Sequence, residues 1–378
     1  MSAPTNAAIR NHFVKLQAAH DTMLVWAGTD ACRLLELDLQ GDKEFKEVEE
    51  CAGVGSLVNE IAGKNKNKWT LKGYVKPNAL GVAPDIGDVL HAAFGDEVIV
   101  GGASVTYQFD PDDPKSLQLM EVADTNMEQA ASGAWVEQLE IEGKGGEFPL
   151  ITAQGGYSRH IWAHGTTSTG AGIGDAIVPL TAGQDGAISV GASVSVGVNT
   201  ARTVTAVTPA TPSITVDPVL ASLVGAGAAV VPYYPAPSVS GTLFTSVADS
   251  LTIDGAALDF ISAKIAFKPG WYGWDDECGS NRATRVLPGA HTLEGEIQAL
   301  WLDMATGFLY GKAWDGTVRT IVWRVGANTA AQRLTVNIRA RLQISAIKVS
   351  GKQCVKWTVK FKGRMNAADG DELSLLLN

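Results

Sequence analysis

Three short stretches of the chain combine residue types that can do chemistry. His160 and His164, in HIWAH, are four residues apart, the spacing at which two imidazoles on one helix can bind a metal ion. GAGIGD (170–175) contains part of the glycine pattern of a dinucleotide-binding turn. WYGWDDEC (271–278) sets three aromatic residues beside three acidic ones, which suits a protein interface or stacking on a sugar.

The surroundings of these stretches do not favour catalysis. HIWAH lies where a strand pattern ends in a Gly/Thr-rich linker, and it lacks the glutamate of a zinc-protease helix. GAGIGD lies in a low-complexity linker without the strand and helix that flank a dinucleotide turn. DPDDPK (110–115) could offer oxygen ligands to calcium, but the two prolines are typical of a plain turn. No Ser–His–Asp or Cys–His arrangement has a recognisable context. We therefore predict that the protein is not an enzyme and uses no cofactor or metal.

Composition narrows the class of protein. The 378 residues carry a net charge of -10, and this disfavours a grip on nucleic acid, which needs a basic patch. A hydrophobic content of 46% is ample for packed cores, and no apolar run has the length of a membrane span. The four cysteines show no CxxC spacing, as expected of reduced thiols in a protein made in the cytoplasm.

The chain divides into four parts by its local patterns. Residues 1–29 form an N-terminal arm or short helix, because apolar residues recur there at roughly helical spacing. Residues 30–164 and 238–378 alternate apolar and polar residues, which predicts strands. Residues 165–237 are rich in Gly, Ala, Val, Thr and Ser and nearly free of charge, which predicts a small inserted all-β domain.

Both longer parts begin with a strand, a long loop and a second strand. In the first, RLLELDLQ and WTLKGYV flank residues 41–68, and in the second, LDFISAKIAF and HTLEGEIQAL flank residues 268–290. DIGDVLHAAFG then predicts a short helix, with Asp85 as its N-cap and Gly95 as its stop. A weaker helical pattern, DMATGFLYGKAWDG, follows the second pair of strands.

These shared patterns predict an internal duplication. TLKG (70–73) matches TLEG (292–295), and LEIEGKGGEF (139–148) matches VKFKGRMNAADGDEL (359–373). In this match Glu140 and Glu142 occupy the places of Lys360 and Lys362. The predicted inter-domain strand residues are therefore Glu140, Glu142, Lys360 and Lys362. The alternative is that any β-rich chain offers alternating strands that can be aligned.

The chain resembles the major tail tube proteins of phages with long flexible tails. DVLHAAFGDEVIVGGASVTYQF, GAWVEQLEIEGKGGEFPLITAQG, SLTIDG (250–255) and WTVKFKGRMNAADGDELSLLLN carry the resemblance, which spans most of the chain outside the insert. It rests on patterns of strand and turn. It implies a mainly β fold of two tandem β-sandwich or barrel tube domains, each with a short helix.

The resemblance also implies a function and partners. The chain would be a virion protein, made in the host cytoplasm, that self-assembles into stacked rings around a lumen for DNA delivery. We expect homotrimeric rings with pseudo-sixfold symmetry, or homohexamers as the alternative, which meet the tape measure, tail terminator and baseplate proteins without touching a membrane. A net negative lumen would let DNA slide without specific binding.

The two long loops match the loop that contacts the next ring in this family. The predicted inter-ring stacking residues are Glu49, Glu50, Asn65, Lys66, Trp271, Trp274, Asp275 and Asp276. The opposite charges of the matched strands would favour alternation of the two domain copies around a ring. The insert is expected to project outward. The alternative function is a carbohydrate-binding or adhesin-type β-protein, which would use the insert or the 271–278 loop as its binding surface.

Overall fold

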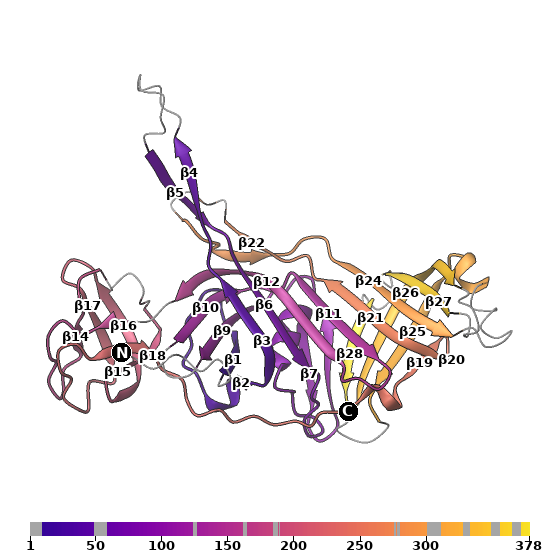
Figure 1. The fold of residues 1–378 in the computed structure, drawn as a ribbon, viewed down its shortest axis with the longest axis horizontal. Helices are drawn as coiled ribbons and strands as arrows, with labels where there is room; N and C mark the ends of the chain where they lie inside the picture. Colours follow the sequence, from indigo (N-terminus) through magenta and orange to yellow (C-terminus); the bar gives the residue numbers. More distant parts are fainter. Residues whose placement is uncertain are drawn as a thin grey trace.

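The protein is mainly β in the computed structural model, in agreement with the alternating sequence (Figure 1). The structure describes residues 10–48, 59–123, 127–161, 165–183, 188, 190–275, 277, 280–300, 311–327, 333–348, 356–364 and 372–378. A single large antiparallel sheet closes on itself, and a separate six-stranded sheet lies at one end of the molecule.

Strands of the N-terminal half form a closed circuit that we call the first barrel. Its order is β1–β9–β10–β12–β6–β3. The short strand β2 pairs with β1, and only Arg33 separates β2 from β3, so the circuit closes. Its strands are β1 (Arg10–Gln17), β2 (Ala31–Cys32), β3 (Leu34–Gln40), β6 (Asn67–Tyr74), β9 (Ser116–Ala123), β10 (Met127–Ala134) and β12 (Leu150–Ile161). A further strand, β11 (Gln138–Lys144), continues β10 along β12.

The C-terminal half repeats this circuit as the second barrel, in the order β19–β25–β26–β27–β24–β21. β20 pairs with β19, and only Asp259 separates β20 from β21, so this circuit closes in the same way. Its strands are β19 (Ser250–Ile253), β20 (Ala256–Leu258), β21 (Phe260–Lys268), β24 (Thr292–Leu300), β25 (Val318–Val325), β26 (Leu334–Lys348), β27 (Lys356–Gly363) and β28 (Leu373–Leu377).

Smaller elements leave each circuit at matching points. Each barrel carries a hairpin between its third and fourth strands along the chain, β4 (Lys43–Val48) with β5 (Asn59–Asn65), and β22 (Tyr272–Trp274) with β23 (Arg285–Leu287). The first barrel adds the helix α1 (Gly87–Phe94) and the hairpin of β7 (Gly95–Val100) and β8 (Ser104–Phe109). In the second barrel, residues 311–314 are helical and β25 follows soon after.

The helix prediction is right in place but wrong about the cap. Gly95 ends α1 with a φ of 87°, a conformation that glycine adopts without strain. Ile86 is the N-cap and gives no side-chain hydrogen bond. The buried Asp85 carboxylate instead lies 3.4 Å from the Arg33 Nε and 4.0 Å from the Lys76 Nζ. These two cations attract the carboxylate away from the N-terminus of the helix.

The predicted N-terminal helix or arm is wrong for residues 10–17. They form β1, which pairs with β9 along its whole length. Phe13 packs on one face of this strand with Trp26, while Val14 joins the barrel core on the other. Since both faces are buried, the strand lacks the apolar–polar alternation that would identify it.

The inserted residues form their own sheet, in the order β13–β18–β15–β16–β17–β14. The bounds are β13 (Gly165–Thr166), β14 (Ile177–Pro179), β15 (Ser193–Val196), β16 (Asn199–Thr208), β17 (Ser213–Asp217) and β18 (Ala229–Pro232). Small β-branched side chains build a core that is separate from the barrel core. Figure 1 shows this sheet beyond the first barrel, on the side away from the second.

One continuous apolar core runs through both barrels. Phe267 on β21 stacks on Phe94 of α1 at 5.3 Å between ring centroids and meets Phe109 of β8 edge-on at 5.0 Å. Trp271 lies 6.0 Å from Phe109. Aromatic residues of the two halves therefore interdigitate, and this fixes the barrels against each other.

Candidate assembly interface

The strand pair β11–β21 joins the two barrels edge to edge. β11 of the first barrel runs antiparallel to β21 of the second, with Ile141 opposite Ile265 and Glu142 opposite Lys264. Ile141 and Ile265 are both buried, because every second residue of these strands points to the shared core. The alternation that predicted these strands therefore also sets the register of the junction.

The other face of this junction is charged. The Lys264 Nζ lies 2.8 Å from a carboxylate oxygen of Glu140. This hydrogen bond raises the pKa of Lys264, and the charges of Glu142 and Glu296 add to the effect. On its other side Lys264 stands opposite Glu296 of β24. Acid and base thus alternate from strand to strand across the join.

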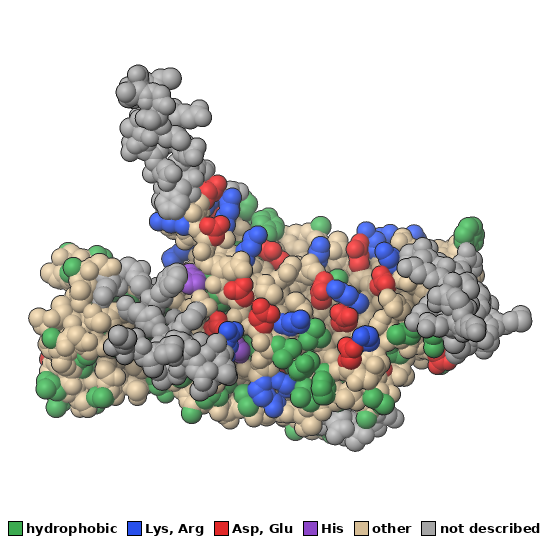
Figure 2. Space-filling model, in the orientation of Figure 1, with side chains coloured by type: hydrophobic (Ala, Val, Ile, Leu, Met, Phe, Trp, Pro, Cys, Tyr) green, Lys and Arg blue, Asp and Glu red, His purple; other side chains and the backbone are tan. Residues whose placement is uncertain are grey.

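These strands belong to a series of eight consecutive strands, in the order β3–β6–β12–β11–β21–β24–β27–β26. Acid and base alternate from β11 through β21 and β24 to β27, whereas Arg341 of β26 stands opposite Lys362 of β27. We call the polar side of the eight strands the charged face. Figure 2 shows acidic and basic side chains interspersed across it. Its charged residues on the described strands include Glu36, Asp38, Lys68, Lys72, Glu140, Glu142, Lys264, Glu294, Glu296, Arg341, Lys360 and Lys362. Acids and bases are nearly balanced among these residues, so they give the face no large net charge.

A shared irregularity identifies the equivalent positions of the two barrels. β3 has a bulge against β6 between Leu34 and Glu36, and β21 has one against β24 between Phe260 and Ser262. In both cases the bulge begins with the first residue of the strand. β3 is therefore the equivalent of β21, and β6 the equivalent of β24. On this basis Asp38 holds the position of Lys264.

The same pairings give the equivalents of the later strands. β12 pairs with β6 through Ile151 and Gly73, and β27 pairs with β24 through Trp357 and Ala299. β12 is therefore the equivalent of β27, which β28 prolongs along β26. β11, which pairs with β12, is the equivalent of the C-terminal half of β26.

This assignment corrects the predicted match of the two charged strands. Glu140 and Glu142 lie on β11, whereas Lys360 and Lys362 lie on β27, the equivalent of β12. The Lys362 Nζ lies 3.5 Å from Glu294 within the second barrel. The acidic strand does meet a basic residue of the other barrel, but this residue is Lys264. The TLKG and TLEG match is likewise four residues out of register, because the bulges align Thr70 with Glu296.

The edges equivalent to this junction stay open at the ends of the eight-strand series. β3 pairs only with β6 on this series, and residues 342–348 of β26 pair only with β27, among the strands that the structure describes. β3 is the equivalent of β21, and this part of β26 is the equivalent of β11. The described part of this series therefore has two open strand edges, and these are the equivalents of the two strands that pair with each other at the internal junction.

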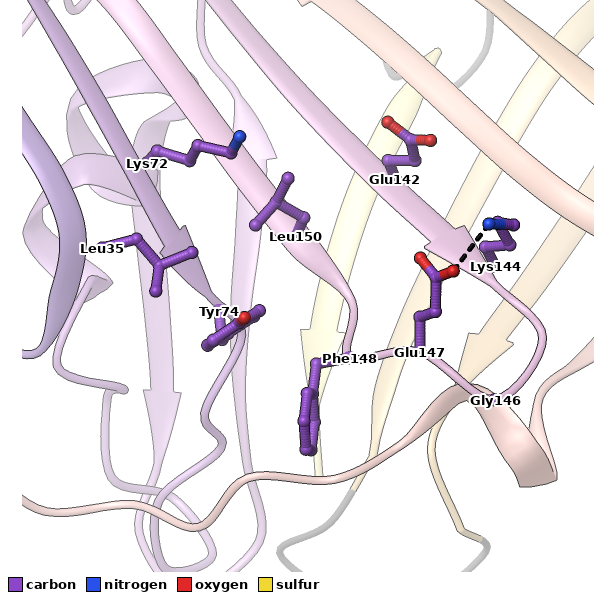
Figure 3. A pocket seen from close by; sticks show the side chains of 9 residues that line it. All are labelled: Leu35, Lys72, Tyr74, Glu142, Lys144, Gly146, Glu147, Phe148 and Leu150. Atoms are coloured by element: carbon purple, nitrogen blue, oxygen red, sulfur yellow. Dashed lines mark hydrogen bonds and ion pairs between the residues drawn. The ribbon is translucent and has the colours of Figure 1, made fainter.

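An open groove with apolar walls lies beside the β3 edge. Leu35 of β3 is 49% exposed, and Phe148 is 43% exposed. The Phe148 ring lies 5.3 Å from the Tyr74 ring, and Figure 3 shows Leu150 close by. An ion pair of Lys144 and Glu147, 2.6 Å apart, closes the other side. Sequence reasoning did not predict Leu35 or Phe148 as interface residues. The signal that could have indicated them is that both are apolar residues next to the edge of a predicted strand.

A second connection between the barrels has no counterpart on the open edges. β8 of the first barrel pairs with β28, the last strand of the second, from Val105↔Leu377 to Gln108↔Ser374. Among the described residues, the β7–β8 hairpin has no equivalent in the second barrel, so the β8–β28 pairing is specific to the junction within the chain.

The hairpin of the first predicted stacking loop projects from the barrels (Figure 1). At its base, the Asn65 backbone N–H donates to the Asn281 carbonyl at 2.8 Å, and the Lys64 Nζ lies 3.8 Å from Asp275. The Lys66 Nζ lies 3.5 Å from Glu44. The predicted residues Glu49 and Glu50 lie outside the described residues, as do Asp276 of the other loop and His164.

The second predicted stacking loop instead packs on the first barrel. Trp271 is 2% exposed, so its ring cannot stack on a sugar. Trp274 is half-buried, with the Arg285 guanidinium 5.7 Å from its ring centroid. The Ser158 hydroxyl of β12 donates to the Ala283 carbonyl at 2.7 Å. The structure thus brings Asn65, Trp274 and Asp275 into one region where the two hairpins meet.

Comparison of the chain with models of known protein families, and with curated proteins, gives no match. Within the described residues, no group of three or more His, Cys, Asp or Glu side chains has a metal-binding arrangement. A search of the same residues for an apolar helix long enough to cross a membrane also finds none.

Proposed function

We propose that this protein is the subunit of a phage tail tube and assembles head to tail into stacked rings. The observation that supports the proposal is the β11–β21 junction within the chain, together with the equivalent edges of β3 and β26, which have no further strand partner among the described residues. Unpaired strand edges are pairing surfaces, and a heterologous contact that repeats generates a closed ring or a helical filament.

The proposed ring closes when the C-terminal half of β26 pairs with β3 of the next chain. The eight strands of the charged face would then continue from chain to chain without a break. The groove at Leu35 and Phe148 adds apolar surface next to this contact, where burial would contribute to association. Three chains would give six barrels, which is the pseudo-sixfold ring that the sequence resemblance implies.

The charged face is the side of the continuous sheet that we assign to the lumen. The opposite side of the same strands is buried under the remaining strands of each barrel, which places the bulk of the protein outside. Interleaved acids and bases offer no continuous basic track, so DNA phosphates would find no strong binding site along it. The proposed lumen is thus nearly neutral, whereas a net negative lumen that repels DNA was expected from the sequence.

The projecting β4–β5 hairpin is proposed to contact the next ring, and the inserted sheet to lie on the outside of the tube. The hairpin extends away from both barrels, as a contact along the tube axis requires. The inserted sheet has its own core and sits at the end of the first barrel. Tape measure, tail terminator and baseplate proteins would be the other partners in the virion.

Negative-stain electron microscopy of the purified full-length protein tests this function. We expect rings about one barrel thick, or stacks of them, at high protein concentration. A protein that stays strictly monomeric over the whole concentration range would contradict the proposal.

A further inference from the structure

We propose that opposite charges at equivalent positions select the head-to-tail junction between chains over contacts of like edges. The inference rests on the proposed ring. It concerns the residues that would make the contact between chains head to tail. Within the chain, acidic Glu142 of β11 stands opposite basic Lys264 of β21. Between chains, the signs are reversed: basic Lys348 of β26 stands opposite acidic Asp38 of β3.

The register between chains follows from the register within the chain. Ile141 pairs with Ile151 of β12, and Ile347 pairs with Trp357, the equivalent of Ile151. Ile347 therefore holds the strand position of Ile141, and the next residue, Lys348, holds the strand position of Glu142.

The partner positions follow from the shared bulge. Ile265 and Lys264 of β21 correspond to Leu39 and Asp38 of β3, by the alignment of the two bulges. Since Ile141 pairs with Ile265, Ile347 would pair with Leu39 of the next chain. The following pair is then Lys348 with Asp38.

Asp38 stands opposite the neutral residue Thr70 of β6, whereas Lys264 stands opposite Glu296 of β24. Asp38 accepts a hydrogen bond from the Gln40 amide at 2.6 Å, and Glu36 lies two residues away on the same face. On the neighbouring strand, Lys72 stands opposite Glu36. The open edge of β3 is thus acidic, whereas the open edge of β26 carries the basic residue Lys348.

The charges discriminate against the contacts that would stop ring growth. Two β3 edges could pair with each other in a symmetric dimer, and so could two β26 edges. A β3–β3 contact would set two edges that both carry Glu36 and Asp38 side by side, and a β26–β26 contact would set two edges that both carry Lys348 side by side. Directly opposed like charges destabilise strand pairs, whereas opposed unlike charges stabilise them.

Charge reversal at each edge tests the inference. In the full-length protein, Asp38→Lys and Lys348→Asp should each raise the concentration at which half of the chains are in rings by about fivefold or more. The double variant D38K/K348D should return it to near the wild-type value, because the pair is restored with opposite polarity. Sedimentation velocity measures the ring fraction, and thermal melting of dilute protein verifies that each variant folds.

Lys362→Asp is the matched control, because it reverses a lysine on the same face away from both open edges. It should assemble as the wild type does. Single variants that assemble as well as the wild type, or a double variant no better than the singles, would overturn the inference while rings still form. A wild-type protein without rings would overturn the proposed function, and this inference with it.

Mixing the two single variants also reports the number of chains in a ring. Chains of D38K and K348D carry complementary edges only when they alternate, and strict alternation needs an even number of chains. An equimolar mixture should therefore recover rings fully if they contain six chains. A ring of three chains keeps one like-charged junction, so the mixture should recover less than the double variant does.

Discussion

The two barrels share one strand order but differ in what they enclose. Cys32 ends β2 opposite His12, and Leu258 ends β20 opposite Leu251, so His12 and Leu251 hold equivalent positions. Each pairs onward in the same way, His12 with Glu121 and Leu251 with Trp323. The first barrel therefore buries a histidine and a glutamate where the second buries a leucine and a tryptophan.

The two buried polar residues differ in their partners: Glu121 has a hydrogen-bond donor, whereas the buried Nε2 of His12 has no hydrogen-bond partner among the described residues and lies 3.9 Å from Glu121. The Glu121 carboxylate accepts a hydrogen bond from the Gln129 amide at 2.8 Å and lies 3.4 Å from the Arg10 guanidinium. Burial, together with the nearby charge of Arg10, lowers the pKa of His12 to about 4. We expect apolar contacts to stabilise the second barrel, and we expect the stability of the first barrel to depend on pH through His12.

The largest expected effect comes from the apolar contact between the barrels. Phe267→Ala removes a fully buried ring that contacts Phe94 and Phe109 of the first half. It should lower the free energy of unfolding by about 3–5 kcal/mol, measured by urea denaturation of the dilute protein. Tyr272→Ala, at an exposed aromatic of the following strand, is the control and should change little. Equal losses in both variants would contradict a junction held by Phe267.

The second effect is a dependence on pH that arises at His12 of the first barrel. The folded-state pKa of His12 is about 4, below its ordinary value of 6.5, so the unfolded chain binds more protons between these values. This group's contribution to stability is therefore present above pH 6.5 and is lost as the pH falls toward 4.

The variant His12→Leu, which copies the second barrel, isolates this contribution. Its free energy of unfolding relative to the wild type should increase by about 3 kcal/mol between pH 7 and pH 4. Leu251→Val, a small change at the equivalent position, should show a difference from wild type that is independent of pH. A pH-independent difference for His12→Leu as well would contradict the assignment of the pH effect to His12.

The smallest expected effect concerns the inserted sheet. Deletion of residues 166–236, with the ends joined by a short Gly/Ser linker, should leave ring assembly unchanged, because the insert packs its own core. Electron microscopy of the deletion variant measures this outcome. Rings that fail to form from a variant with normal barrel stability would show that the insert contributes to the ring contact.

Part of the architecture could be predicted from the sequence. Strict alternation identified β3, β6, β11, β21, β24 and β27, because each has one buried and one solvated face. β1 was missed, since it is buried on both faces, and the small residues of β10 gave no pattern to read. Of the predicted interface residues, Glu140 and Glu142 do lie at the junction of the barrels, while Lys360 and Lys362 face Glu296 and Glu294 within the second.

By itself, the sequence determined the mainly β class, the position of the insert and the alternation of charge along each strand. These properties are local, because side chains two residues apart share a face whatever strand lies next to them. The tertiary structure decided which strands are neighbours, where the bulges set the register, and which edges stay open. Pairing joins residues far apart in the chain, and a one-residue bulge shifts every partner after it, so the true equivalents of Glu142 and Lys264 emerged only from the folded sheet.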